Sequence, residues 1–323
     1  MTKAIRIHAN GGPEVLVWEE VPTPEPGPTE ALIKHHAVGL NYIDVYFRNG
    51  LYKAPGLPLI IGQEGAGTVT AVGSAVTDVV VGDRVAYAGP IGGYATDRVI
   101  AADRLVKLPV AISFETGAAM MLQGMTAQYL IRRTYPVKSG DTIVVHAAAG
   151  GVGLILCQWA KALGATVIGV VSSEAKAELA RAHGAAHAVV GTARLVAEVK
   201  RITGGAMVPV VYDSVGRDTF TASLDCLAPL GLMASYGNAS GPVAPFDLGV
   251  LAAKGSLYLT RPTLATYTAK RADLERVAAD LFDAVRSGAV KIQVNQTYAL
   301  KDAAAAHVAL EGRQTTGSTV LVP

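Results

Sequence analysis

The chain has 323 residues, of which half are apolar and 17% are charged, and its formal net charge at pH 7 is +2. This profile is typical of a compact globular enzyme and excludes a disordered chain. So small a net charge, without blocks of one sign, also argues against a nucleic-acid or acidic-membrane partner.

The two cysteines, Cys157 and Cys226, are too few for a disulfide framework or a multi-thiolate structural zinc site. The N-terminal sequence MTKAIRIHANGG lacks the apolar core of a secretory signal. A charge-free run from Thr142 to Ala160 is at the lower length limit for a membrane span, but a three-glycine stretch and Gln158 interrupt it. We therefore expect a soluble, cytoplasmic protein.

The first third of the chain predicts β-structure interrupted by turns. Pro- and Gly-rich segments at residues 22–28 and 89–93 separate short apolar runs. This pattern is typical of a barrel-like or rolled sheet rather than of alternating strand–helix units. The runs are Ala31–Ile33, Gly67–Val72, Val85–Tyr87 and Val99–Ala101.

From about Pro109 the pattern changes. A helix is predicted over Ser113–Arg133, with Ser113 and Thr116 at its start. Strands and helices then alternate, and their apolar β-branched strands predict a parallel, doubly wound sheet. The strands are Thr142–His146, Thr166–Val171, His187–Val190, Val208–Asp213 and Gly231–Tyr236, and the helices are Gly153–Leu163, Glu174–His183, Leu195–Thr203 and Thr219–Leu227.

The end of the chain breaks this alternation. After a helix at Lys270–Gly288 come the segment Val290–Tyr298, a helix around Lys301–Glu311 and a last strand at Ser318–Val322. A short β/α/β tail after a complete nucleotide-binding fold suggests that the chain returns to its first domain.

The turn between the first strand and helix of the alternating region has the spacing of a dinucleotide fingerprint. Ala148-x-Gly150-x-x-Gly153 replaces the usual first glycine with alanine. Gly150 lets the backbone approach a pyrophosphate, Gly153 allows the helix to pack on the strand, and the helix N-terminus supplies N–H groups. A structural turn is the alternative, but the strand–turn–helix context favours phosphate binding.

The end of the second strand decides which dinucleotide is expected. NAD-binding units usually carry an acid there, whereas this chain has Ser172 and Ser173, which leave room for a 2′-phosphate. Lys176 reaches the same place from the next helical turn. Glu174 argues for NADH, but at a helix start it also serves the dipole. NADPH is therefore favoured.

At this point the chain resembles the zinc-independent quinone oxidoreductases, the zeta-crystallin group of the medium-chain dehydrogenase/reductase superfamily. The resemblance runs essentially from end to end. Its motifs are GLNYIDVYFRNGLY (39–52), GQEGAGTVTAVG (62–73), VGDRVAY (81–87), GMTAQYL (124–130), HAAAGGVG (146–153), VVYDSVG (210–216), SYGNASG (235–241), LYLTRP (257–262) and TTGSTVLVP (315–323).

The resemblance implies an α/β protein in which a doubly wound parallel (Rossmann) domain is inserted in a mainly β, GroES-like catalytic domain. The expected ranges are 1–123 and 265–323 for the catalytic domain and 124–264 for the dinucleotide-binding domain. The resemblance also implies an active site in the cleft between the domains, and a homodimer.

Zinc-using relatives hold the catalytic metal with a Cys and a His where this chain has Asn41 and Gln63. Neither residue suits a zinc site of N and S ligands, and Glu64 alone cannot hold the ion. We therefore predict no metal.

The histidine pairs give no alternative site. His35 and His36 alternate across a strand and cannot converge on one ion. His183 and His187 have ligand-like spacing, but Gly184 breaks the helix between them.

Without a Lewis acid, alcohol oxidation loses its means of stabilising an alkoxide. Hydride transfer to an electrophilic acceptor, a quinone or the C=C of an enone, remains easy, and hydrogen-bond donors can stabilise the acceptor oxygen. The catalytic candidates are Asn41, Tyr46 and Tyr52. The tyrosines have packing as an equal alternative, and Asn41 has a turn-forming role as its alternative. Asp44 is interpreted as a structural hydrogen-bond partner rather than a base.

The resemblance also implies the cofactor contacts. One departure is at Val190-Gly191-Thr192, where relatives often place a tyrosine against the adenosine phosphate. We expect its absence to weaken NADPH binding or to relax the selectivity for NADPH. The expected contacts are Asn41, Tyr42, Tyr46, Thr126 and Tyr129 at the nicotinamide half, Gly150, Gly151 and Val152 at the pyrophosphate, Ser172, Ser173, Lys176 and Arg313 at the 2′-phosphate, and Ser214, Gly237 and Asn238 at strand ends.

The leading hypothesis is an NADPH-dependent quinone reductase. An NADPH-dependent alkenal/enone double-bond reductase is the nearest alternative, because the two differ only in pocket shape. A non-catalytic NADPH-binding redox sensor is the alternative of another class.

Overall fold

The computed structural model describes residues 1–323, which divide into two compact units. Unit 1 contains residues 1–123, 268–282 and 292–323, and unit 2 contains residues 124–267 and 283–291. Residues 268–282 and 292–323 thus group with the N-terminal segment. No helix is both long and apolar enough to cross a membrane.

Unit 1 contains a three-stranded sheet of order β2-β1-β4 and a seven-stranded sheet of order β15-β16-β3-β5-β6-β8, with β7 also pairing with β3. The strands are β1 (Thr2–Ile7), β2 (Val17–Val21), β3 (Glu30–Leu40), β4 (Leu59–Ile60), β5 (Glu64–Val72), β6 (Arg84–Ala88), β7 (Asp97–Ala101), β8 (Val106–Lys107), β15 (Val294–Ala299) and β16 (Ser318–Val322). The helices are α1 (Tyr42–Arg48) and α10 (Ala303–Glu311), with 3-10 turns η1 (Pro13–Val15), η2 (Ala102–Arg104) and η4 (Leu300–Asp302).

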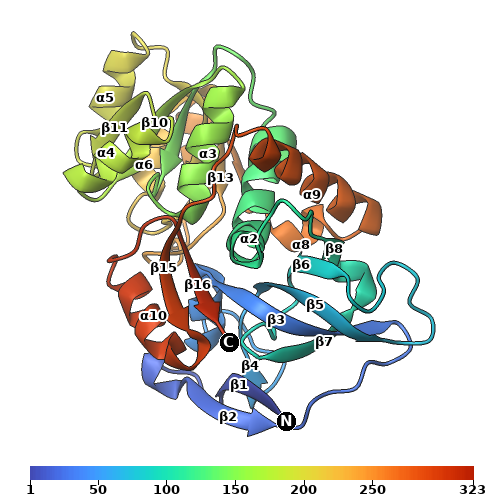
Figure 1. Ribbon diagram of the computed structural model, residues 1–323. Coiled ribbons are helices and arrows are strands. Elements are labelled where there is room, and N and C mark those ends of the chain that lie inside the picture. The colour runs from blue at the N-terminus through green and yellow to red at the C-terminus, as the bar shows by residue number, and fades with distance from the viewer. The chain divides into compact units, whose positions relative to one another are not determined.

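The C-terminal strand completes the larger sheet of unit 1. β16 pairs antiparallel with β3, so that Thr319, Val320 and Leu321 lie opposite Leu40, Gly39 and Val38. Figure 1 shows β15 and β16 beside α10, at the end of the chain. The tail therefore supplies part of the sheet from which Asn41 emerges.

α1 is a correction to the expectation that the first third is only strands and turns. Asn41 caps this helix, and the Asn41 N–H donates to Asp44 Oδ2 at 2.9 Å. The Asn-x-x-Asp spacing is the sequence signature of this capping arrangement.

Unit 2 is built on a six-stranded sheet of order β11-β10-β9-β12-β13-β14, in which every pairing is parallel. Its strands are β9 (Thr142–His146), β10 (Thr166–Val171), β11 (His187–Val190), β12 (Val208–Asp213), β13 (Leu227–Ser235) and β14 (Tyr258–Thr260). Its helices are α3 (Gly151–Ala162), α4 (Glu174–Ala182), α5 (Leu195–Ile202), α6 (Phe220–Asp225), α7 (Gly249–Ala253) and α8 (Leu264–Tyr267), with a π-helix η3 (Leu130–Thr134). The helices α2 (Phe114–Tyr129) and α9 (Arg271–Arg286) begin in unit 1 and end in unit 2.

Alternate residues of β10 meet helices on opposite faces of the sheet. Ile168 and Val170 share a buried cluster with residues of α5 and α6. Gly169, between them, faces Ala180 of α4 instead. Figure 1 shows α3 and α4 beside β10. The predicted doubly wound sheet is therefore confirmed.

The predicted elements of unit 2 differ from the structure mainly at their ends. α3 begins two residues earlier than predicted, at Gly151. The predicted helix over Thr219–Leu227 ends at Asp225, because Leu227 already pairs with Val208 and starts β13. Helix propensity does not register this pairing, which depends on the neighbouring strand.

Candidate active site

The candidate phosphate-binding turn lies between β9 and α3 in unit 2. Ala147 adopts φ 50°, and Gly150 caps α3 with extended backbone. A Cβ on Gly153 would lie 2.2 Å from the Ala147 carbonyl oxygen, so only glycine fits there. The predicted packing role of Gly153 is therefore confirmed.

The first turn of α3 presents N–H groups at this edge of the sheet. The Leu154 N–H donates to the Gly150 carbonyl at 2.8 Å and closes the first helical turn. The N–H groups of Gly151 and Val152 precede that bond and have no partner within the helix. Gly150, Gly151 and Val152 are each partly exposed. This arrangement suits an anionic ligand.

Ser172 and Ser173 follow β10, whose end lies beside that of β9 because Val170 is opposite His146. Both serines are exposed. Ser173 caps α4, and its Oγ accepts from the Lys176 backbone N–H at 3.4 Å. Glu174 is exposed at the first position of α4, as its dipole role requires.

Ser214 and Gly237 lie together after β12 and β13, where Asp213 is opposite Ser235. A Cβ on Gly237 would lie 2.3 Å from the Ser214 carbonyl oxygen. The two loops are therefore in backbone contact at the same strand edge as the phosphate turn, and in a parallel sheet this edge is where ligands bind.

Two residues that sequence reasoning missed hold these loops. Asp213 Oδ1 accepts the N–H groups of Val215 (2.8 Å) and Gly216 (3.1 Å). Arg261 Nη1 donates to the carbonyls of Ser235 (2.7 Å) and Gly237 (3.1 Å). VVYDSVG contains Asp213 and LYLTRP contains Arg261, so these two motifs were the sequence signal that could have identified them.

Asn238 is held by the same arginine. With its amide oriented to satisfy both ends, Asn238 Nδ2 donates to the Gly237 carbonyl and Oδ1 accepts from Arg261 Nη2, each at 3.0 Å.

Thr126 and Tyr129 lie one turn apart on α2, and both are buried. The Tyr129 ring stacks on that of Tyr267, with centroids 4.4 Å apart and planes 7° apart. Burial raises the pKa of Tyr129, against a hydrogen bond with Thr126. Tyr129 is thus a neutral phenol with a fixed ring.

In unit 1, Tyr42, Tyr46 and Tyr52 form what we call the tyrosine cluster. The Tyr46 ring centroid lies 5.1 Å from that of Tyr52 and 6.1 Å from that of Tyr42. Tyr46 is buried, whereas the other two are partly exposed. The Tyr42 hydroxyl donates to the Leu310 carbonyl at 3.3 Å. Three of the predicted residues are therefore together.

Arg313 is exposed, with φ 57°, after α10. Its positive charge acts on the pKa of Tyr42, which burial raises and Arg313 lowers. The structure places Arg313 in unit 1, whereas the other predicted 2′-phosphate residues lie in unit 2.

Asn41 belongs to a buried polar network that the sequence did not predict. Asn41 Nδ2 donates to Glu64 Oε2 at 2.7 Å, and Gln123 Nε2 donates to Asn41 Oδ1 at 3.0 Å. Ser318 Oγ donates to Gln123 Oε1 at 2.7 Å. The four residues come from four distant segments, so no single local motif contains all of them.

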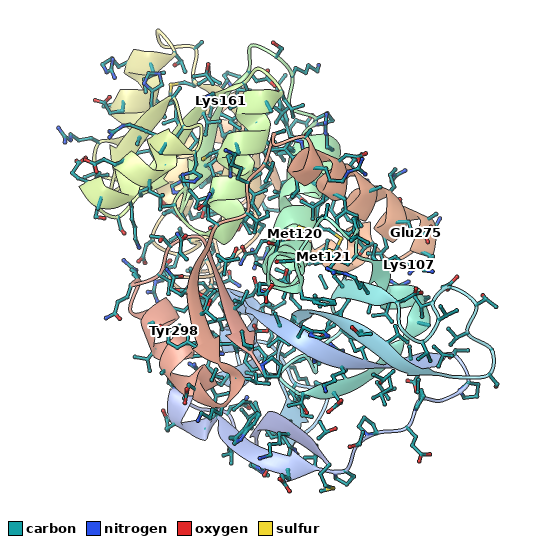
Figure 2. The ribbon with its side chains drawn as sticks, in the orientation of Figure 1. Lys107, Met120, Met121, Lys161, Glu275 and Tyr298 are labelled. Carbon is teal, nitrogen blue, oxygen red and sulfur yellow. The ribbon has the colours of Figure 1, made fainter.

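Burial raises the pKa of Glu64 to about 8, against the lowering effects of the Asn41 side chain and the Leu122 and Met121 N–H groups. Met121 and its neighbour Met120 lie on α2 and are fully buried; both are labelled in Figure 2. Burial also raises the pKa of Asp44 to about 7. Asp44 accepts from the Asn41 N–H and, at 3.1 Å, from the Tyr94 hydroxyl. Its predicted structural role is confirmed.

These residues do not fit a catalytic zinc ion. The Asn41 amide donates to Glu64 through Nδ2 and accepts from Gln123 through Oδ1, and the amides of Asn41 and Gln63 are not ligands of the kind zinc prefers. His35 is buried and His36 exposed on β3, as the predicted alternation requires. α4 ends before Gly184, which has φ 107° and separates His183 from His187.

Comparison with known proteins places the chain in a family. The model described as "Alcohol dehydrogenase GroES-like domain" matches residues 27–110, and the one described as "Zinc-binding dehydrogenase" matches residues 151–282. A quinone oxidoreductase of Pseudomonas aeruginosa is 55% identical, with all of both chains covered.

Two further relatives bear on chemistry. The crystal structure of Escherichia coli quinone oxidoreductase complexed with NADPH has 48% identity and a TM-score of 0.97, over all of both chains. A 2-haloacrylate reductase of Burkholderia sp. is 46% identical over all of this chain and 99% of its own. With whole-chain identity at this level, the protein belongs to the zeta-crystallin-like quinone oxidoreductases of the medium-chain dehydrogenase/reductase superfamily.

Proposed function

We propose that this protein is an NADPH-dependent quinone reductase that needs no metal. The observation that carries the proposal is the turn before α3, with its glycine-only packing at Gly153 and its first-turn N–H groups, in a chain similar throughout to an NADPH-bound quinone oxidoreductase. When bound, NADPH supplies a hydride, and with one proton from solvent the quinone becomes a hydroquinone.

The residues of unit 2 bind and orient the cofactor in this proposal. Gly150, Gly151 and Val152 hold the pyrophosphate through backbone N–H groups. Ser172, Ser173 and Lys176 hold the 2′-phosphate, and Arg313 is the further cation predicted for it. Ser214, Gly237, Asn238, Thr126 and Tyr129 contact the rest, toward the nicotinamide.

The residues of unit 1 act on the acceptor. The tyrosine cluster packs against a planar ring, and Asn41 donates an N–H to the acceptor oxygen as negative charge develops there. Tyr42 and Tyr46 also face the nicotinamide. The domain ranges that accompany this proposal are 1–123 and 265–323 for catalysis and 124–264 for the dinucleotide.

We also propose a cytoplasmic homodimer. β14 is an edge strand of the sheet of unit 2, and its Tyr258 is 61% exposed. Exposed edges with apolar side chains are common places for a second copy to pair. Light scattering coupled to size exclusion measures the mass, and a monomer would rule the dimer out.

The deciding experiment is NADPH oxidation at 340 nm with 1,4-benzoquinone, 9,10-phenanthrenequinone and a simple enone, with NADH in parallel. Turnover with quinones and a preference for NADPH is the expected result. The 46% identity to a 2-haloacrylate reductase supports double-bond reduction as the second candidate, which turnover with the enone alone would favour. Tight NADPH binding without turnover of any acceptor would favour a redox sensor.

A further inference from the structure

The buried network around Asn41 is a linear chain of hydrogen bonds, called the file below. Every bond in it runs from donor to acceptor in the same sense along the chain. Ser318 donates to Gln123, Gln123 donates to Asn41, and Asn41 donates to Glu64. Glu64 Oε1 accepts from the Leu122 N–H at 2.8 Å, which leaves Oε2 to Asn41. All four side chains are buried. The file therefore ends on Glu64 Oε2, which must accept a hydrogen bond from Asn41.

The same file is also satisfied in the opposite direction. Each amide has a donor end and an acceptor end, so a half-turn of both side chains exchanges their roles. A proton on Glu64 Oε2 would donate to Asn41 Oδ1, Asn41 Nδ2 to Gln123, and Gln123 Nε2 to Ser318. Ser318 would then turn its one hydroxyl proton from Gln123 to the Ala119 carbonyl, from which its Oγ lies 3.0 Å. No buried group would be left without a partner.

The protonation of Glu64 therefore decides between the two directions. The ionisable side chains that interact with Glu64 are Asp44 on α1, Tyr87 on β6 and Tyr94. None is a cation, and Asp44 opposes a second negative charge. Burial raises the pKa of Glu64 to about 8, so both states are accessible near neutral pH.

We propose that Glu64 is a positioning residue: through the file to Gln123 and Ser318, it sets which end of the Asn41 amide faces Gln123 and which faces Glu64. This rests on the proposed role of Asn41 as donor to the acceptor oxygen. The direction in the structure, with Nδ2 on the Glu64 side, is the productive one. Reversal exchanges N and O and presents the carbonyl where the donor is needed.

Glu64→Gln tests the inference because glutamine mimics the protonated acid. Its Oε1 keeps the Leu122 N–H and its NH2 donates to Asn41, so the file is locked in reverse with no partner lost. We expect the thermal midpoint and the NADPH Kd to stay close to those of the wild type. We expect kcat with 9,10-phenanthrenequinone to fall at least tenfold at pH 9 and to match the wild type at pH 6. The wild-type kcat should rise with pH, and that of E64Q should not.

Thr319→Val is the matched control. Thr319 is the neighbour of Ser318 on β16, is also buried, and donates to Gln296 Oε1 at 3.1 Å outside the file. T319V should lower the thermal midpoint slightly and keep both kcat and its pH profile. An E64Q enzyme with wild-type or higher kcat at pH 9 would overturn the proposal. If E64Q does not fold, E64Q/Q123E replaces it, because the carboxylate introduced at position 123 then accepts from Asn41 and Ser318.

A second measurement separates this inference from the proposed function. Neutron diffraction from deuterium-exchanged crystals at pH 6 and pH 9 locates the deuterated nitrogen end of the Asn41 amide directly. The inference requires that nitrogen beside Glu64 at pH 9 and beside Gln123 at pH 6, whichever acceptor the enzyme reduces. One unchanged orientation would overturn it even in an active quinone reductase, and absence of quinone turnover with a reversing amide would refute only the function.

Discussion

Gly153 of α3 and Ala147 after β9 are so close that a Cβ on the glycine would lie 2.2 Å from the alanine carbonyl oxygen. Gly153→Ala must therefore push the helix away from the turn. We expect a loss of about 1–3 kcal/mol in the free energy of unfolding, as for other overpacked sites, and at least tenfold weaker NADPH binding.

Urea unfolding and fluorescence titration with NADPH measure these two effects. Gly56→Ala is the control, because nothing lies within 4 Å of a Cβ there. A G153A protein that resembles G56A in both measurements would show that the helix and turn are not tightly fitted.

Lys176 and Arg313 should decide the preference for NADPH over NADH. Lys176→Ala and Arg313→Ala each remove a cation from the proposed 2′-phosphate site, so we expect KM for NADPH to rise about tenfold and KM for NADH to change little. Lys161→Ala removes an exposed charge from the last turn of α3, located in Figure 2, and should change neither value. A parallel rise in both KM values would contradict this role.

Arg261 should affect binding of the nicotinamide half of the cofactor and not of the adenosine half. Its side chain holds the backbone carbonyls of Ser235 and Gly237, and Gly237 is assigned to the nicotinamide side. Arg261→Gln is expected to raise the Kd of NADPH about tenfold and to leave that of adenosine 2′,5′-bisphosphate unchanged. Arg217→Gln, which removes a charge that is paired with Asp218 at the surface, serves as the control. Equal weakening of both ligands in R261Q would mean that the whole unit is disturbed. Calorimetric titration measures all four constants.

His35 should make unit 1 less stable in acid. Burial lowers the pKa of this histidine to about 4, against a hydrogen bond with the Ala95 carbonyl. The unfolded chain binds a proton below pH 6.5 and the folded chain does not, so stability is lost as the pH falls from about 6.5 toward 4. Between pH 7.5 and 5.5 the loss from this group is about 1.4 kcal/mol.

His35→Gln keeps an amide that can hydrogen-bond where Nε2 contacts the Tyr87 hydroxyl, and removes the titration. Its unfolding free energy in urea should therefore fall by about 1.4 kcal/mol less than that of the wild type over the same interval. Glu64 and Asp44 have raised pKa values and act in the opposite sense, but both are present in the two proteins and cancel. An identical pH dependence of H35Q and wild type would contradict the assignment.

The parallel sheet could be predicted because each strand and helix of unit 2 is specified locally. Val144 and Val145 are buried on both faces of β9, and the run of β-branched residues is visible in the sequence. Gly153 was likewise identified from its spacing alone. By contrast, α1 was missed although Asn41 and Asp44 have the spacing of a cap, since seven residues carry little helical periodicity.

The network around Asn41 could not be predicted for a different reason. Gln123 and Ser318 are 195 residues apart, and they meet because β16 pairs with β3 and α2 lies beside both. Gln123 lies just outside the motif GMTAQYL, and the motif TTGSTVLVP, which contains Ser318, does not indicate what this serine contacts. Their chemistry depends on which amide end faces which neighbour, which only the packed structure determines.

The pairing of β16 with β3 also constrains how the chain folds during synthesis. Most of unit 2 is one continuous stretch, residues 124–267, and can fold as soon as it leaves the ribosome. β3 emerges first but must wait for the last strand, some 280 residues later, before its edge is covered. During that wait the edge is open to other chains, and contacts so distant in sequence form slowly. A truncation of even the last few residues would therefore leave the earliest-made domain without its closing strand.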